Sequence, residues 1–289
     1  MFEGFETRQI DTGEALINLR IGGSGRPLLL LHGYPETHLM WHKIAPRLAE
    51  RFTCIVPDLR CYGDSSKPAS DPEHLSYSKR ATAGDQVKVM QALGYDRFMV
   101  AGHDRGGRVT HRLCLDHPDR VERASILDIV PTPVVYGTVN QRVATAYYHW
   151  FFLIQPHDFP ETLIGANPEY FLRKTLLSWS AAETFPPEVF AEYLRCFRKP
   201  ETIHATCEDY RAGASIDLEH HKADKGRKIA CPIQILWGEK GLVGRGYDTL
   251  AVWRDYAENV VGQSVPSGHF LPEEAPDETL QAMLSFFDG

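Results

Sequence analysis

Five short apolar runs, each ending in turn residues, constrain the fold of this chain more than any other feature of its sequence. They are PLLLLHG (27–33), TCIVPDL (53–59), RFMVAGHD (97–104), ASILDIV (124–130) and PIQILWG (232–238). Near-continuous apolar strands are typical of a parallel sheet buried on both faces, and amphipathic segments at 77–94, 106–117 and 274–287 supply covering helices. We therefore predict an α/β fold with a mostly parallel, doubly wound sheet, preceded by an N-terminal hairpin at 5–23.

The alternation of strands and helices stops between residues 132 and 228. Helix-like segments rich in aromatic residues follow one another there, separated by prolines, and no run resembles a strand of the sheet. Open α/β sheets bind ligands at the carboxyl ends of their strands. We predict an α/β core formed by residues 1–131 and 229–289, with residues 132–228 inserted between two strands as a helical lid over that edge.

Charge and cysteine content exclude several classes of partner. The net charge of −7 disfavours nucleic acid and anionic membranes, and it requires local positive charge for any anionic substrate. The six cysteines have no C-x-x-C spacing, which favours buried free thiols over a disulfide framework or a metal site. The N-terminal residues show no positively charged segment followed by an apolar run, which a secretory signal peptide would have. No apolar run near the N-terminus is long enough to span a bilayer. We expect a soluble, cytoplasmic protein without metal or cofactor.

An aspartate stands in the turn that follows the run at 97–104. The motif GHDRGG (102–107) has Asp104 where a G-x-S-x-G turn lifts a serine to the top of the sheet. A carboxylate is already an anion at pH 7, and it can displace a leaving group from a saturated carbon to form an ester. The alternative is that Asp104 only caps the next helix.

Four motifs in order carry a resemblance to a known family: HGYP (32–35), DLRCYGDS (58–65), GHDRGG (102–107) and SGHF (267–270). Over essentially its whole length the chain resembles the α/β-hydrolases that use an aspartate nucleophile, which include haloalkane dehalogenases, epoxide hydrolases and haloacetate dehalogenases. The resemblance implies that Asp104 is the nucleophile and His269 the general base. It also implies that the backbone N–H groups of Tyr34 and Arg105 stabilise the oxyanion.

The histidine needs a carboxylate partner that fixes its tautomer. The superfamily often supplies this acid a few residues after the strand at 232–238, but Gly241 stands there and Glu239 comes too early. The alternative position follows the preceding strand, where Asp128 interrupts an apolar run. A buried aspartate without a partner would be costly, so we predict that Asp128 orients His269.

Two arginines follow the nucleophile, where haloalkane dehalogenases and many epoxide hydrolases have a tryptophan directly after it. Arg105 and Arg108 lie three residues apart, so both can face the space beside Asp104. Each contact with a substrate carboxylate at about 4 Å contributes on the order of 4 kcal/mol before desolvation. We predict a carboxylic acid substrate. The alternative, that both arginines are solvated or pair with Asp116 and Glu122, is disfavoured because cations oppose the helix dipole there.

The arginine pair narrows the resemblance to fluoroacetate dehalogenases. That family implies a halide site formed by His149, Trp150 and Tyr210 in the lid, since fluoride needs several donors to replace its water. The expected reaction converts fluoroacetate and water to glycolate and fluoride. The alternative is that these lid aromatics are ordinary packing, as we expect for Trp179, a lining or core residue.

The sequence is also compatible with functions other than haloacetate dehalogenation. An epoxide hydrolase would share Asp104 and His269 and would need lid tyrosines, for which Tyr147, Tyr148, Tyr170 and Tyr193 are candidates. A silent receptor for a small acid and a serine esterase fit less well. The sequence leaves open the preference between fluoroacetate and chloroacetate, larger 2-haloacids, the natural substrate and a homodimer. Cys61 replaces a glycine usual in relatives, so a positive φ there would strain the loop.

Overall fold

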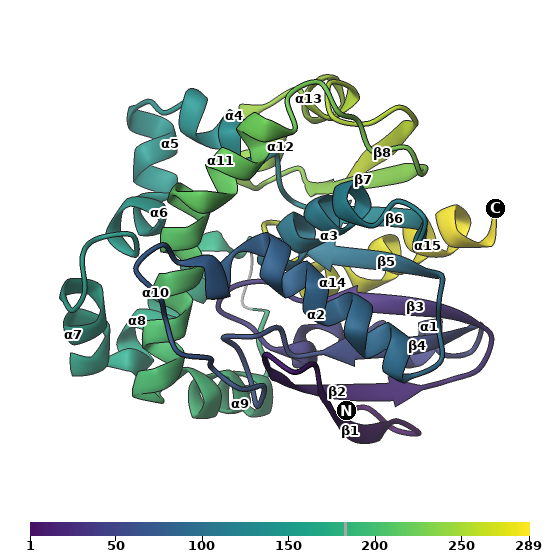
Figure 1. Cartoon of the computed structure of the whole chain (residues 1–289), viewed down its shortest axis with the longest axis horizontal. Coiled ribbons are helices and arrows are strands. Elements are labelled where there is room, and N and C mark those ends of the chain that lie inside the picture. Colours follow the sequence, from purple (N-terminus) through teal and green to yellow (C-terminus); the bar gives the residue numbers. More distant parts are fainter. Residues whose placement is uncertain (182–183) are drawn as a thin grey trace.

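The computed structural model describes residues 1–181 and 184–289, and these residues contain an eight-stranded sheet. The strand order is β1-β2-β4-β3-β5-β6-β7-β8 (Figure 1). β2 pairs antiparallel with β1 and β4, and all other neighbours are parallel. The bounds are β1 Glu6–Asp11, β2 Leu16–Gly22, β3 Arg26–Leu31, β4 Phe52–Pro57, β5 Phe98–His103, β6 Val121–Leu127, β7 Ile233–Gly238 and β8 Val260–Val265. The predicted fold class and N-terminal hairpin are confirmed.

The helices in the described part of the chain fall into three groups. Those before the insertion are η1 His38–Trp41, α1 Ala45–Leu48, η2 Leu75–Tyr77, α2 Lys79–Ala92 and α3 Arg105–Asp116. Those between β6 and β7 are α4 Thr132–Gly137, α5 Gln141–Ala146, α6 Tyr148–Phe152, α7 Phe159–Ala166, α8 Pro168–Trp179, α9 Pro187–Phe197, α10 Pro200–Ala214 and α11 Ile216–Ala223. The last are α12 Leu242–Gly246, α13 Thr249–Arg254, α14 Leu271–Glu274 and α15 Pro276–Asp288.

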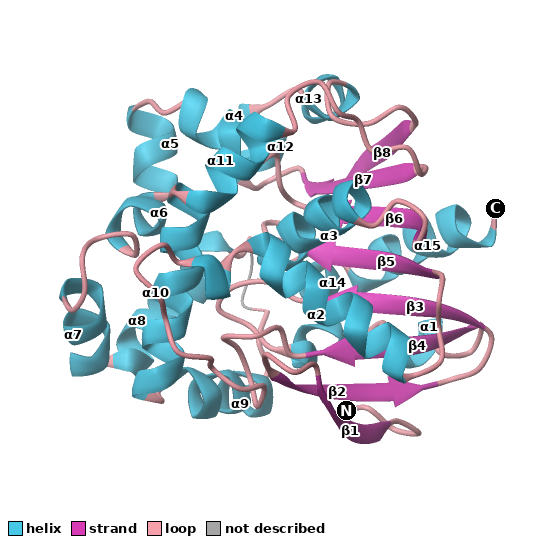
Figure 2. Cartoon of the chain, in the orientation of Figure 1, coloured by secondary structure: helices cyan, strands magenta, loops and turns pink. Residues whose placement is uncertain are grey.

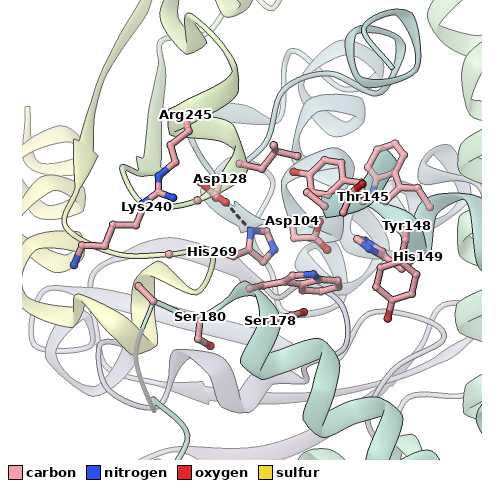
Figure 3. Close-up of a pocket in the computed structure, with 18 residues that line it drawn as sticks. Asp104, Asp128, Thr145, Tyr148, His149, Ser178, Ser180, Lys240, Arg245 and His269 are labelled. Carbon is pink, nitrogen blue, oxygen red and sulfur yellow. Dashed lines mark hydrogen bonds and ion pairs between the residues drawn. The ribbon is translucent and has the colours of Figure 1, made fainter. Parts of the chain in front are cut away.

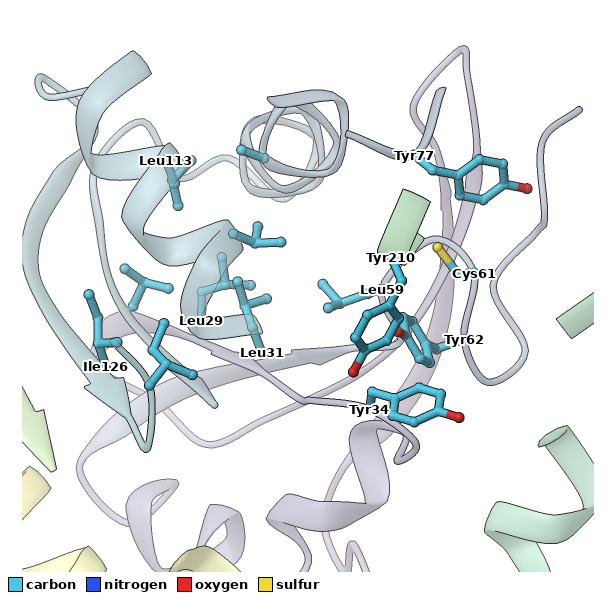
Figure 4. Packing of buried hydrophobic residues seen from close by; sticks show 14 of the residues in the cluster. Leu29, Leu31, Tyr34, Leu59, Cys61, Tyr62, Tyr77, Leu113, Ile126 and Tyr210 are labelled. Atoms are coloured by element: carbon cyan, nitrogen blue, oxygen red, sulfur yellow. The ribbon is translucent and has the colours of Figure 1, made fainter. Parts of the chain in front are cut away.

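Both faces of the sheet are covered, which explains the continuous apolar runs. Alternate residues of a strand point to opposite faces. Leu29 and Leu31 of β3 belong to one buried cluster, together with Leu113 of α3 (Figure 4). Leu28 and Leu30 belong to a second cluster that includes residues of α15. A strand whose two sets of side chains are both buried has no polar side to alternate with an apolar one.

The helices between β6 and β7 gather at one end of the sheet, on the left in Figure 2. They occupy the segment that we predict to be a lid. β5 points toward them (Figure 1), and Asp104 directly follows its last residue, His103. The carboxyl ends of the parallel strands therefore face the inserted helices.

The strand β8 is absent from the strands predicted from the sequence. Most of its side chains are exposed or half-buried, because β8 lies at an edge of the sheet. It therefore has no continuous apolar run. Pairing with β7, over Ile233↔Val260 to Gly238↔Val265, makes it a strand.

Cys61 lies in the turn after β4 and has a φ of +89°. The sequence analysis made strain at this position depend on a positive φ, and that condition is met. Such a conformation favours glycine, so the backbone of Cys61 is strained. All six cysteines are free thiols, and five of them are buried.

None of the helices in the described residues combines the length and the apolar character that crossing a bilayer requires.

Candidate active site

Asp104 sits on a tight turn between β5 and α3, with a φ of +45°. Two of the three glycines of the motif are required by close approaches of the chain. A Cβ on Gly102 would lie 2.3 Å from the carbonyl oxygen of Gly106 and from Thr110 Oγ1. A Cβ on Gly106 would lie 2.5 Å from the carbonyl oxygen of His32. The motif therefore allows a strained turn that puts the Asp104 carboxylate at the edge of the sheet.

The Asp104 carboxylate is held as an anion. Burial opposes its charge, but His269, Arg105 and Arg108 outweigh this effect and lower its pKa below the usual range. The Tyr34 amide N–H donates to Asp104 Oδ1 at 3.0 Å. In the described residues we observe no hydrogen bond from the Arg105 amide N–H, the second predicted oxyanion donor.

His269 lies between two aspartates (Figure 3). Its Nδ1 is 2.6 Å from Asp128 Oδ2, and the other oxygen of Asp128 accepts the Gly238 amide at 2.9 Å. Because a carboxylate only accepts, Nδ1 carries the proton and Nε2 keeps its lone pair. The structure thus brings Asp128 to His269. A Cβ on Gly241, the vacant alternative position, would lie 3.6 Å from Asp128 Oδ2.

Arg108 is a buried cation without an acidic partner in the described residues. Its Nη1 donates to the carbonyl oxygen of Val130 at 3.1 Å and to Thr132 Oγ1 at 3.0 Å, and its Nε is buried without a partner. Its guanidinium carbon lies 4.5 Å from the centre of the Trp150 ring. Burial and the neighbouring Arg105 lower its pKa. An unpaired buried charge is costly, so this position favours an anionic ligand.

Arg105 is also buried, but it pairs with an acid that the sequence analysis did not consider. Its Nε donates to Asp209 Oδ2 at 2.6 Å and its Nη2 to the Asp209 carbonyl oxygen at 2.8 Å. Its guanidinium carbon lies 4.1 Å from the centre of the Tyr210 ring. Neither arginine pairs with Asp116, as the alternative interpretation requires. Asp116 binds Arg80 and Arg112 instead.

The three predicted halide ligands lie close together. The ring centres of His149 and Tyr210 are 5.6 Å apart, and those of Trp150 and Tyr210 are 6.2 Å apart. Their side-chain polar groups make no hydrogen bonds to the described residues, although all three residues are buried. Burial lowers the pKa of His149 to about 3, so its imidazole is neutral. Burial raises the pKa of Tyr210, so its hydroxyl remains a donor.

A cavity of about 520 Å³ opens over these groups (Figure 3). Asp104, Asp128, His149, Trp150 and His269 line it, and Trp179 does so as expected. Arg105, Arg108 and Tyr210 are not among the lining residues. The positive charges of Arg105 and Arg108 nevertheless help to lower the pKa values of Asp104 and His149.

Three further residues support the site and were missed. Asp209 looked like any charged residue of a lid helix, and only its burial distinguishes it. His103 also supports the site, since its Nε2 is 2.8 Å from the carbonyl oxygen of His269. Glu36 Oε2 lies 3.2 Å from His103 Nδ1. The position of His103 next to Asp104 was the one feature of the sequence that could have identified it as a residue of the site.

Comparisons with known proteins identify relatives of this chain. The model of the alpha/beta hydrolase fold family matches residues 26–276. A fluoroacetate dehalogenase from Burkholderia sp. is 46% identical over 99% of this chain and 95% of its own length. A soluble epoxide hydrolase from Corynebacterium sp. (strain C12) is 38% identical over 92% and 91%.

A solved structure from Nostoc sp. PCC 7120, described as an alpha/beta hydrolase, superposes with a TM-score of 0.98 at 62% identity and covers 99% of both chains. The family model and the 46% identical relative each span far more than half of the chain. The chain therefore belongs to the α/β-hydrolase family, and within it to the group of sequences that includes the fluoroacetate dehalogenase.

Proposed function

We propose that this protein hydrolyses the carbon–halogen bond of a haloacetate, with fluoroacetate as the substrate that best fits its donors. The observation that carries the proposal is Arg108, a buried guanidinium without an acidic partner in the described residues, whose charge lowers the pKa of Asp104. A substrate carboxylate would supply the missing anion. The similarity to the fluoroacetate dehalogenase supports the same substrate class.

In the first step the substrate carboxylate binds Arg105 and Arg108, and a carboxylate oxygen of Asp104 attacks the halogen-bearing carbon. The new C–O bond forms as the C–F bond breaks, and fluoride leaves with the bonding electrons. The neutral His149, Trp150 and Tyr210 donate hydrogen bonds to the departing fluoride. All three residues are buried, and His149 Nδ1 is a buried atom without a hydrogen-bond partner in the described chain. Such groups support this assignment, because fluoride needs a replacement for its hydration.

In the second step water attacks the carbonyl carbon of the Asp104 ester. Nε2 of His269 takes the proton of the water, and Asp128 stabilises the imidazolium that forms. The amides of Tyr34 and Arg105 are the proposed donors to the developing oxyanion. In the resting structure the Tyr34 amide already contacts the Asp104 carboxylate oxygen, which supports this role. As the intermediate collapses, the bond between its carbonyl carbon and the glycolate oxygen breaks, and that oxygen takes the proton from the His269 imidazolium. Loss of the second proton of the water to solvent restores the Asp104 carboxylate.

We also propose that residues 132–228 act as the lid of this site. They provide His149, Trp150 and Tyr210, and the cavity lies between them and the sheet edge. Exclusion of water by such a cover strengthens each of the hydrogen bonds proposed for fluoride.

Epoxide hydrolysis is the second candidate function. It is favoured by Tyr147 and Tyr148, which line the cavity and could protonate an opening epoxide. Tyr193 binds Glu273 and Tyr170 is 60% exposed, so neither supports that role. A neutral epoxide would leave the charge of Arg108 without an anion, which is why we rank this function second.

Trapping the ester tests the covalent scheme. The His269→Ala variant should form a stable adduct on Asp104 when given chloroacetate or fluoroacetate, detected by mass spectrometry of the peptide that contains this residue. Asp104→Asn is the control and should stay unmodified. An unmodified Asp104 in the His269→Ala protein would refute the ester. Halide release from both acids, measured beside diol formation from styrene oxide, separates the two candidate functions.

A further inference from the structure

A buried chain of alternating charges connects Arg105 to the inserted helices. Arg105 of α3 pairs with Asp209 of α10, which also binds Lys79 at the start of α2. Lys79 in turn lies 3.5 Å from Asp217 of α11, and its amide donates to the same carboxylate at 2.9 Å. All four residues are at most 5% exposed. The arrangement joins two core helices to two helices of the insertion.

The contacts of Asp209 use one edge of the Arg105 guanidinium and leave another free. Nε and Nη2 donate to the side chain and the carbonyl oxygen of Asp209. Nη1 donates to no acceptor in the parts of the chain that the structure describes. The two bonds to one residue fix the plane of the group, because a guanidinium holds its donors in a rigid fork.

Helix α10 also provides further contacts of the Arg105 guanidinium. The Tyr210 ring packs against it at 4.1 Å, one residue after Asp209. Gly213 follows Asp209 by one helical turn, and a Cβ there would lie 3.2 Å from Arg105 Nη2. Residues four apart share one face of a helix. On α10, Asp209 therefore provides an acid for Arg105, Tyr210 an aromatic ring, and Gly213 the space that a side chain would otherwise fill.

Asp209 keeps its charge in this buried place without cancelling that of Arg105 completely. Burial raises the pKa of Asp209, but Arg105 and Lys79 together lower it below its usual range. Lys79 takes Oδ1, while the Tyr62 hydroxyl donates to Oδ2 at 3.0 Å. The negative charge is shared between two cations, so Arg105 retains positive charge for a further anion.

We infer that Asp209 is a positioning residue that turns the free Nη1 edge of Arg105 toward the substrate carboxylate. The inference rests on the proposed binding of a carboxylic acid beside Asp104. It means that the carboxylate subsite is assembled across the core and the insertion: α3 supplies the cation, and α10 fixes its orientation. Asp209 touches neither the reacting carbon nor the halide in this scheme.

The test compares Asp209→Asn with a matched control. Asp224→Asn makes the same change in another buried pair, since Asp224 follows α11 and its Oδ2 lies 2.5 Å from Arg112 Nη1 of α3. Arg112 is not a site residue. Both variants should unfold at lower temperature. Only Asp209→Asn should raise the Kd for glycolate in calorimetry and the KM for chloroacetate, by about tenfold to a hundredfold, as loss of a charge-assisted hydrogen bond predicts.

A purely structural role for Asp209 gives a different result. If Asp209→Asn leaves the glycolate Kd within twofold of the wild type, or if Asp224→Asn weakens binding equally, the inference is overturned. Should Asp209→Asn fail to fold, the triple variant Asp209→Asn, Lys79→Met and Asp217→Asn removes the ammonium together with both of its acidic partners. We expect it to restore thermal stability but not affinity. Recovery of both together would again overturn a positioning role.

The glycolate measurement separates this inference from the proposed function. A wild type that binds glycolate but releases no halide from chloroacetate would refute the dehalogenase, and the comparison of variants would still decide the role of Asp209. A wild type that binds no glycolate would refute the carboxylate subsite and this inference with it.

Discussion

Replacing Asp128 by asparagine should separate the two chemical steps. Asp128 Oδ1 accepts the Gly238 amide and Oδ2 accepts His269 Nδ1. An asparagine that keeps the bond from Gly238 must turn its NH₂ toward Nδ1. The amide then donates where the carboxylate accepted, which favours the imidazole tautomer with the proton on Nε2. His269 could not take a proton from water in that tautomer.

The magnitude follows from the charge that is lost. At a charge separation of about 4 Å and an effective dielectric constant of about 20, the Asp128 carboxylate stabilises an imidazolium by about 4 kcal/mol. That value corresponds to a decrease of about a thousandfold in the rate of ester hydrolysis. The alkylation step depends on Asp104 and the arginines, so it should remain fast.

Rapid-quench measurements of chloride release from chloroacetate provide the assay. Asp128→Asn should give a burst of about one chloride per active site, followed by slow turnover as the ester accumulates. A burst that is absent, or steady turnover within about threefold of the wild type, would refute the assignment of Asp128 to the second step.

A relocated acid gives this prediction a matched control. Gly241 has an ordinary φ of −78°, and a Cβ there would lie 3.6 Å from Asp128 Oδ2 without a close contact. Asp128→Asn with Gly241→Asp should therefore recover at least about tenfold of the hydrolysis rate. Asp128→Asn with Gly241→Asn has the same shape without the charge and should not. Equal recovery in both would show that charge is not the cause.

Three other predictions concern the anion site, the halide and acid stability. Arg108→Gln should raise the KM for chloroacetate by about tenfold to a hundredfold. It should not lower the free energy of unfolding, because it removes a buried unpaired charge. A loss of stability with an unchanged KM would contradict this prediction. Tyr210→Phe keeps the ring under the guanidinium and removes only the hydroxyl, so kcat/KM should fall about tenfold or more for fluoroacetate and less for chloroacetate; equal losses would argue against a fluoride donor. His32 accepts the Leu59 amide on Nε2, and burial lowers its pKa to about 4 from 6.5. Because its folded pKa lies below the unfolded one, its stabilising effect is complete above pH 6.5 and is lost on acidification. Urea unfolding should show a loss of about 2 kcal/mol between pH 7 and pH 5 from this group, which His32→Gln should remove; identical slopes for both proteins would refute it.

Features that depend on near neighbours along the chain can be predicted from the sequence. Continuous apolar runs predicted the buried strands, since a strand covered on both faces has no polar side. The edge strand β8 lacks such a run, and only its pairing with β7 reveals it. The order of four motifs was enough to single out Asp104 and His269, and the apolar surroundings of Asp128 indicated that this aspartate needs a partner.

Contacts between side chains from distant segments become visible only in the folded chain. Arg105 and Asp209 are 104 residues apart, and no local pattern distinguishes this aspartate from the exposed acids of other helices. Arg108 looks equivalent to Arg105 in the sequence, but the fold gives it carbonyl and hydroxyl acceptors in place of a carboxylate. Burial explains the difference: a charge removed from water depends on the few groups that the fold places around it, and the linear order of residues does not contain that information.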